Sequence, residues 1–110
     1  MFNFQKELKI KMNNLAHEIY RLTKQFPKSE IYGITSQINR ASLSVILNYI
    51  EGYARIRPKN RLNFMEIFYG SLKETQYLLH FTHTEKLISQ PDYTRLFQIA
   101  DQTERCYGQK

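Results

Sequence analysis

The 110-residue chain has little of what tight turns, disulfides and membrane spans require. Four glycines and three prolines are too few for the many turns of a β-sandwich or barrel, so the composition favours an all-α protein. The single cysteine, Cys106, excludes an internal disulfide. No run approaches the roughly 18 apolar residues of a membrane span, and no segment has the pattern of a secretory signal. We therefore expect a soluble, cytoplasmic protein with no membrane partner.

Motifs of enzymes and cofactor sites are also lacking. The sequence has no Gly-rich phosphate loop, no Gly-x-Ser-x-Gly element and no dinucleotide fingerprint. His80 and His83 lie three residues apart, but no third and fourth ligand follow at the spacing of a zinc site, and Cys106 has no partner at useful spacing. We predict a protein that is not an enzyme, with no catalytic residues, cofactor, metal or small-molecule substrate.

Charge is distributed unevenly along the chain. Residues 1–61 carry eleven basic and four acidic side chains, a net charge of +7, whereas residues 62–110 carry five basic and six acidic ones, a net charge of −1. A positive field of this kind favours a polyanionic partner such as RNA or DNA, although basic side chains also serve solubility alone.

The spacing of apolar residues predicts four helices, at about residues 5–26, 31–55, 58–87 and 90–107. Alternating steps of three and four place the apolar residues of each segment on one stripe. The first stripe contains Leu8, Met12, Leu15, Ile19, Leu22 and Phe26; the second contains Ile31, Ile34, Ile38, Ala41 and Val45 and extrapolates to Asn48 and Gly52. Short connections between four helices predict one domain over residues 1–110, an antiparallel up-down-up-down four-helix bundle.

The second helix has more apolar residues than one stripe needs. Its other faces carry Leu43, Ile46, Leu47 and Ile50. A helix that is apolar most of the way round must be covered on more than one side, and in so short a chain we expect the second cover to be another subunit. These four residues are therefore the predicted oligomer interface.

Three segments carry a family resemblance. They are FPKSEIYGITSQ at residues 26–37, RASLSVILNYIEGYAR at residues 40–55 and NFMEIFYGSLKETQYLL at residues 63–79. Their order of Phe-Pro, Tyr-Gly, Thr-Ser-Gln, Asn, Glu-Gly and Gly-Ser-Leu resembles the bacterial four helix bundle protein family. That family comprises the rRNA intervening-sequence proteins and, more distantly, the accessory variability determinant subunits of diversity-generating retroelements. The resemblance implies a four-helix protomer, a ring-shaped homopentamer, no known catalysis, and basic surfaces that engage nucleic acid or a reverse transcriptase with its template RNA.

A cluster of cations marks the junction of the second and third helices. Arg55, Arg57, Lys59 and Arg61 put four positive charges into seven residues, and no acidic residue occurs from Gly52 to Met65. Because each cation that neutralises a phosphate releases a counterion, we predict that this cluster binds nucleic acid, with Lys6, Lys9 and Lys11 of the first helix extending the contact. The alternative is a solvated, salt-screened loop. Tyr53 and Tyr69 are candidates for stacking on bases, or else rim tyrosines of the core.

Asn48, Glu51 and Gly52 form the Asn-x-x-Glu-Gly element. Because Gly costs about 1 kcal/mol relative to Ala inside a helix, Gly52 predicts a close approach of another backbone. For Asn48 and Glu51 we favour structural polar contacts, with Arg40 or Arg55 as partner; acid–base or metal chemistry by Glu51 with Glu66 is the alternative, but no Glu-x-x-His motif supports it.

Two functions remain after these exclusions. The leading one is a basic, non-enzymatic, oligomeric accessory protein that binds RNA or DNA, either as a subunit of a retroelement reverse transcriptase complex or as an rRNA-associated protein. The alternative is an oligomeric protein interaction module that binds no nucleic acid.

Overall fold

The computed structural model describes residues 4–108, which form four α-helices and one short 3-10 helix. The helices are α1 (Phe4–Thr23), α2 (Ile34–Ala54), α3 (Pro58–Thr84) and α4 (Gln90–Gly108), and η1 (Lys28–Glu30) lies between α1 and α2. No strand occurs in this part of the chain. The predicted all-α, single-domain, four-helix architecture is confirmed.

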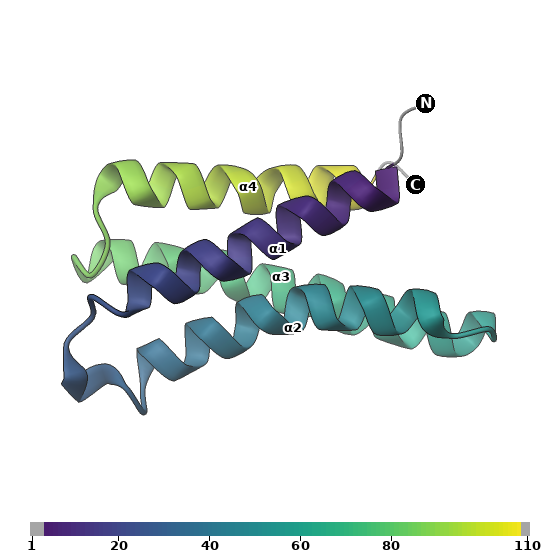
Figure 1. Cartoon of the computed structure of the whole chain (residues 1–110), viewed down its shortest axis with the longest axis horizontal. Coiled ribbons are helices and arrows are strands. Elements are labelled where there is room, and N and C mark those ends of the chain that lie inside the picture. The colour runs from purple at the N-terminus through teal and green to yellow at the C-terminus, as the bar shows by residue number, and fades with distance from the viewer. Residues whose placement is uncertain (1–3, 109–110) are drawn as a thin grey trace.

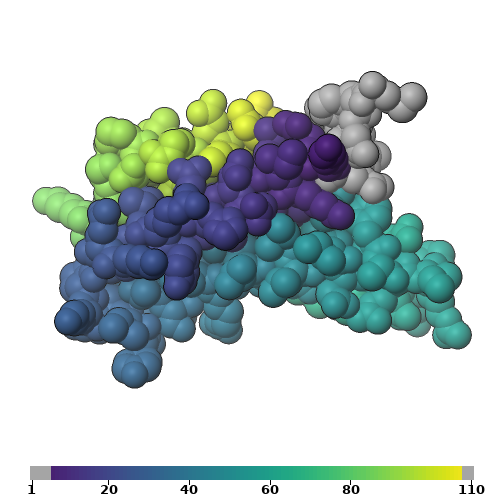
Figure 2. Space-filling view, in the orientation of Figure 1, coloured from purple at the N-terminus to yellow at the C-terminus, as the bar shows by residue number. Residues whose placement is uncertain are grey.

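Each helix packs against two others, so that the chain closes into a bundle (Figure 1). α1 contacts α2 and α4, α3 contacts α2 and α4, and the contact between α2 and α3 is the most extensive. With 27 residues, α3 is about 40 Å long at 1.5 Å per residue. The α2–α3 hairpin consequently extends beyond the described ends of α1 and α4, and its connecting loop forms a projecting tip (Figures 1 and 2).

The core follows the predicted stripes. On α1, Leu8, Met12, Leu15 and Ile19 are at most 1% exposed, as the spacing predicted. On α2 the stripe departs from the prediction, because Tyr49 is fully buried while Asn48 is only half-buried. Both residues lie near the core face of α2. Tyr49 takes the inner position because it has the larger apolar surface to bury.

The connection between α1 and α2 is longer than predicted. α1 ends at Thr23 rather than at residue 26, because the amide groups of residues 24–26 bond to carbonyls three residues back and the last turn tightens before Pro27. α2 begins at Ile34 rather than at residue 31. Ile31 is half-exposed in the turn after η1 and is not part of the stripe.

A Schellman motif ends α3 at Thr84, three residues before the predicted end. The amide of Leu87 donates to the carbonyl of Thr82 at 2.8 Å and that of Lys86 to the carbonyl of His83 at 3.0 Å. Lys86 has a φ of 62°, in the left-handed region that usually takes glycine at this position. α4 then begins near Ser89, whose hydroxyl accepts a hydrogen bond from the amide of Asp92 at 3.3 Å.

Candidate nucleic-acid interface

The projecting tip consists of the end of α2, residues 55–57 and the first turn of α3. Arg55 and Arg57 have extended backbone conformations, and Pro58 occupies the first position of α3, where its missing amide hydrogen has no cost. Gly52 is buried at the base of the tip: a Cβ there would overlap the methyl group of Met65 and lie 3.3 Å from the Cβ of Phe64. The glycine therefore provides the close approach of α2 to α3 that the sequence predicted.

Two of the four tip cations are engaged within the chain. The guanidinium of Arg55 pairs with the carboxylate of Glu51 at 2.7 Å and lies 4.8 Å from the ring centroid of Phe64. Arg61 donates a hydrogen bond to the backbone carbonyl of Arg55 at 3.0 Å and lies over the ring of Tyr53 at 5.4 Å. These contacts hold the loop against both helices.

The other two cations, Arg57 and Lys59, point to a different role. Both are exposed, and neither makes an ion pair or a hydrogen bond through its side chain to any residue from 4 to 108. Ile56, between Arg55 and Arg57, is 94% exposed. The tip thus presents two unpaired charges and one uncovered apolar side chain on a braced loop.

Side chains, rather than helix dipoles, make the tip positive. The N-terminus of α3 and the C-terminus of α2 meet here, and their opposite partial charges offset each other. Four basic side chains gather at the tip, and the only carboxylate bound to one of them is that of Glu51 among the described residues. The positive charge of the tip therefore comes from these side chains.

The first-helix lysines begin at the same end of the bundle. The N-terminus of α1 lies on the side of the molecule from which the tip projects (Figure 1). Lys9 is exposed, whereas Lys11 is half-buried, pairing with Glu7 at 3.4 Å and donating to the amide oxygen of Gln102 at 3.4 Å. Lys6 is exposed but interacts with another group of the chain. Of the three, Lys9 most resembles the unpaired tip cations.

Asn48 and Glu51 have structural contacts in this protomer. The amide of Asn48 donates to the carbonyl and to the hydroxyl of Ser44, both at 2.8 Å, and that hydroxyl lies 2.8 Å from the hydroxyl of Ser71 on α3. Asn48 therefore reaches α3 through Ser44 rather than directly. Glu51 binds Arg55, not Arg40, and Arg40 is exposed without an ion pair in the described chain.

The two tyrosines considered for base stacking already make contacts within the chain. Tyr53 is half-buried, with its ring 4.8 Å from that of Tyr49 and beneath Arg61. Tyr69 donates from its hydroxyl to Glu104 at 3.1 Å and lies 6.2 Å from the ring of Tyr107. Both rings serve the packing of the bundle in this structure.

Glu104 on α4 is a polar centre that the sequence analysis missed. It pairs with Lys73 at 2.8 Å and accepts hydrogen bonds from Gln76 and Tyr69, both at 3.1 Å. The bond from Lys73 is the main cause that lowers the pKa of Glu104, and Glu104 in turn raises the pKa of Lys73. The signal in the sequence was the polar spacing of residues 69, 73 and 76 on one face of α3. The cluster joins α3 to α4.

The predicted oligomer interface is mostly open in the protomer. Leu43, Leu47 and Ile50 are 49%, 55% and 45% exposed and follow one another at helical spacing on the outer face of α2. Ile46 differs, being half-buried against the core. Leu43 and Ile46 also line a groove of about 260 Å³ between α1 and α2, together with His17 and Tyr20. Leu43, Leu47 and Ile50 are hereafter called the α2 outer face.

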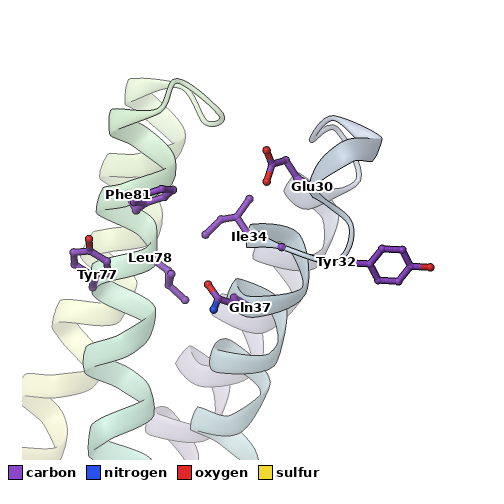
Figure 3. A pocket seen from close by; sticks show the side chains of 8 residues that line it. Glu30, Tyr32, Ile34, Gln37, Tyr77, Leu78 and Phe81 are labelled. Atoms are coloured by element: carbon purple, nitrogen blue, oxygen red, sulfur yellow. The ribbon is translucent and has the colours of Figure 1, made fainter.

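A second groove, of about 360 Å³, lies between the start of α2 and the last third of α3 (Figure 3). Ile34, Leu78 and Phe81 face it, with Gln37 and Glu30 at its edge, whereas the Tyr32 side chain points away and is 98% exposed. Glu30 is the only titratable carboxylate in its lining. The groove therefore combines apolar side chains of α2 and α3 with polar groups at its edge.

The histidines do not gather into a ligand set. His83 stacks on Tyr93 with a centroid distance of 4.5 Å, and His80 is exposed. Within residues 4–108 no three His, Cys, Asp or Glu side chains are placed to hold a metal ion. Of the helices in this range, none has an apolar stretch long enough to cross a membrane.

The fold and the basic tip place this chain in the class of small, basic four-helix-bundle proteins. A model of the family described as 23S rRNA-intervening sequence protein matches residues 6–108, nearly the whole chain. The chain belongs to the 23S rRNA-intervening sequence protein family, and the resemblance inferred from its sequence is confirmed.

The fold also matches a solved structure. It is a protein of unknown function from the S23 ribosomal protein family of Bacteroides thetaiotaomicron, with a TM-score of 0.86, 19% sequence identity and 94% of each chain covered. At that identity the likeness shows a shared fold. No curated protein matches the chain.

Proposed function

We propose that this protein is a non-enzymatic accessory protein that binds RNA or DNA through the tip of the α2–α3 hairpin. The observation that carries the proposal is the pair of unpaired cations, Arg57 and Lys59, at the tip of the hairpin that projects past the bundle (Figures 1 and 2). A charge already paired inside the protein gains little by contacting a phosphate. An unpaired one releases a counterion from the nucleic acid when it binds.

The proposal includes assembly of several copies, and the homopentameric ring implied by the family resemblance is the arrangement we favour. The support from this structure is the α2 outer face, three apolar side chains that each remain about half exposed in the protomer. Several copies in one particle would present several tips to one polymer. Weak contacts at each tip would then act together at high effective concentration.

The cellular partner that we propose rests on family membership and family resemblance rather than on geometry. The family's name suggests an rRNA-associated role, and a reverse transcriptase with its RNA is suggested only by the more distant resemblance to retroelement accessory subunits. Gene neighbourhood distinguishes them: an rRNA operon supports the first role, and a reverse transcriptase gene beside variable repeats supports the second.

The second candidate function is an oligomeric interaction module without nucleic-acid binding. The α2 outer face favours it, since apolar contact between copies needs no polyanion. Under this alternative the tip cations only keep the protein soluble.

Titration over a range of salt concentrations separates the two functions. We expect the parent protein to bind RNA at about 50 mM salt, and Arg57→Gln with Lys59→Gln to reduce the magnitude of the log–log salt slope by about 2, one for each lost phosphate contact. The matched control is Arg21→Gln with Lys28→Gln, because these exposed residues have the same charges at the opposite end of the bundle. The control should keep the parental slope.

The outcomes are distinct once all variants have the same oligomeric mass. Equal losses in the tip variant and the control would show diffuse attraction rather than a site at the tip. No binding by the parent protein at low salt would leave the interaction module as the function.

A further inference from the structure

Ile56 has no structural reason to be apolar. Its side chain is 94% exposed, in the middle of the α2–α3 connection, and belongs to no core cluster. Its neighbour Arg55 turns back onto Glu51 and Phe64, which leaves Ile56 and Arg57 as the projecting side chains between the two helices. An apolar side chain in this position faces solvent in the free protein, and its environment in a complex depends on the molecule that the tip binds.

The loop around Ile56 is braced on both sides. Arg61 bonds to the carbonyl of Arg55, the residue before Ile56, at 3.0 Å, and Pro58 fixes the backbone two residues after it. A braced loop loses less conformational freedom on binding than a free one. The bundle lies behind the tip (Figure 1), so the tip can enter a narrow space before the rest of the molecule collides.

The charge around Ile56 indicates which kind of molecule binds at the tip. Four cations lie within residues 55–61 and no acidic residue occurs from 52 to 65, so the apolar side chain sits inside a positive field. Proteins that bind nucleic acids use single apolar side chains, isoleucine among them, as wedges between unstacked bases, with cations on the flanking phosphates. In RNA the accessible bases are those of bulges, loops and helix ends.

We propose that Ile56 contacts bases, and that the tip therefore prefers RNA with an unstacked or bulged base over a continuous duplex. This inference rests on the proposed nucleic-acid binding at the tip. In the proposed complex Arg57 and Lys59 bind the phosphates on either side of the unstacked base, and Ile56 replaces part of the stacking contact that this base has lost. An anionic membrane is a poorer fit, because surface anchoring needs a broad apolar helix face and the tip offers one side chain.

The test compares two RNA hairpins that differ only in a one-nucleotide bulge in the stem. The parent protein should bind the bulged hairpin more tightly. Ile56→Ala should lower the affinity for it by about tenfold and remove the preference, with an unchanged salt slope, because the lost contact is apolar rather than ionic. Ile56→Leu should retain most of the preference. Ile31→Ala, the same change in a half-exposed residue at the opposite end, is the control.

Every other outcome either rejects the proposed function or overturns the inference about Ile56. Failure of the parent protein to bind either hairpin would reject the proposed function itself. Tight binding by the parent protein with an unaltered preference in Ile56→Ala would overturn the inference alone and leave phosphate binding intact. A change of oligomeric mass in Ile56→Ala would place the side chain in a contact between copies. Recovery of the parent protein, but not of Ile56→Ala, on anionic phospholipid vesicles would assign the tip to a membrane. Either of the last two results would also overturn the inference.

Discussion

The guanidinium of Arg61 donates a hydrogen bond to the backbone carbonyl of Arg55 at 3.0 Å, across the loop that joins α2 to α3. One basic residue thereby fixes the backbone conformation of another, whose own side chain is held by Glu51. The basic cluster is thus divided into cations that shape the tip and cations that the tip displays.

Arg61→Gln should destabilise the protein more than Arg57→Gln does. The first variant loses a hydrogen bond and a cation–π contact with Tyr53, and we expect a free energy of unfolding about 1 kcal/mol lower. The second loses no contact made within the described residues and should stay within about 0.5 kcal/mol of the parent protein. Urea unfolding of both variants measures the difference, and equal stabilities would show that the loop is not braced by Arg61.

Gly52→Ala and Gly70→Ala should have opposite effects. Each removes the entropic cost of a glycine inside a helix, about 1 kcal/mol. A Cβ at Gly70 meets nothing within 4 Å, so this variant should be more stable by about that amount. A Cβ at Gly52 displaces the buried Met65 methyl group and crowds the Cβ of Phe64, so this variant should be less stable by about 1 kcal/mol. Thermal unfolding compares them, and a stabilised Gly52→Ala would contradict the close contact of α2 with α3.

Lys86→Gly should stabilise the protein. Lys86 has a φ of 62° at the end of α3, a conformation that costs a residue with a Cβ about 1 kcal/mol and glycine almost nothing. Part of this gain is offset by the larger freedom of glycine in the unfolded chain, so we expect a net gain of about 0.5 kcal/mol. Lys24→Gly, in the turn that follows α1, removes the same side chain without relieving a positive φ and should give no gain. Chemical denaturation of both variants measures their free energies of unfolding relative to the parent protein.

The apolar spacing predicted the four helices because each contains an apolar stripe that can be recognised without knowledge of its neighbours, although three helix ends lie three residues from their predicted positions. Sequence patterns failed where two interactions compete at one place. Asn48 and Tyr49 both lie near the inner face of α2, and only the neighbouring helices decide that Tyr49 is the buried one. Likewise, the cluster at residues 55–61 was visible as charge, but the engagement of Arg55 and Arg61 depends on side-chain directions at the loop.

The stability of the protein in acid should depend on Glu104. Its pKa in the folded state is lowered, chiefly by Lys73, so the ionised cluster stabilises the fold at pH values above the ordinary carboxyl pKa of about 4.3. That contribution is lost as the pH falls through the folded-state pKa. Glu104→Gln should therefore lower stability at pH 7 by about 1 kcal/mol and flatten the decline below pH 4. Unfolding measured from pH 7 to pH 3 tests this, with Glu74→Gln, an exposed residue of α3 without an ion pair in the described chain, as control. Parallel curves for Glu104→Gln and the parent protein would contradict the role of the cluster.

Leu47→Asp should dissociate the assembly without unfolding the protomer. Leu47 is 55% exposed in the protomer, so a carboxylate there stays hydrated in an isolated copy. Between two copies the same charge would lose its water without gaining a counterion, a cost of several kcal/mol for each interface. Light scattering at micromolar concentration should give a multiple of 13.2 kDa for the parent protein and a smaller mass for the variant, with unchanged helical circular dichroism. Leu62→Asp is the control, because Leu62 is 58% exposed on α3 and outside the α2 outer face. Equal effects of the two substitutions, or a parent protein that is already monomeric, would remove the α2 outer face as the interface.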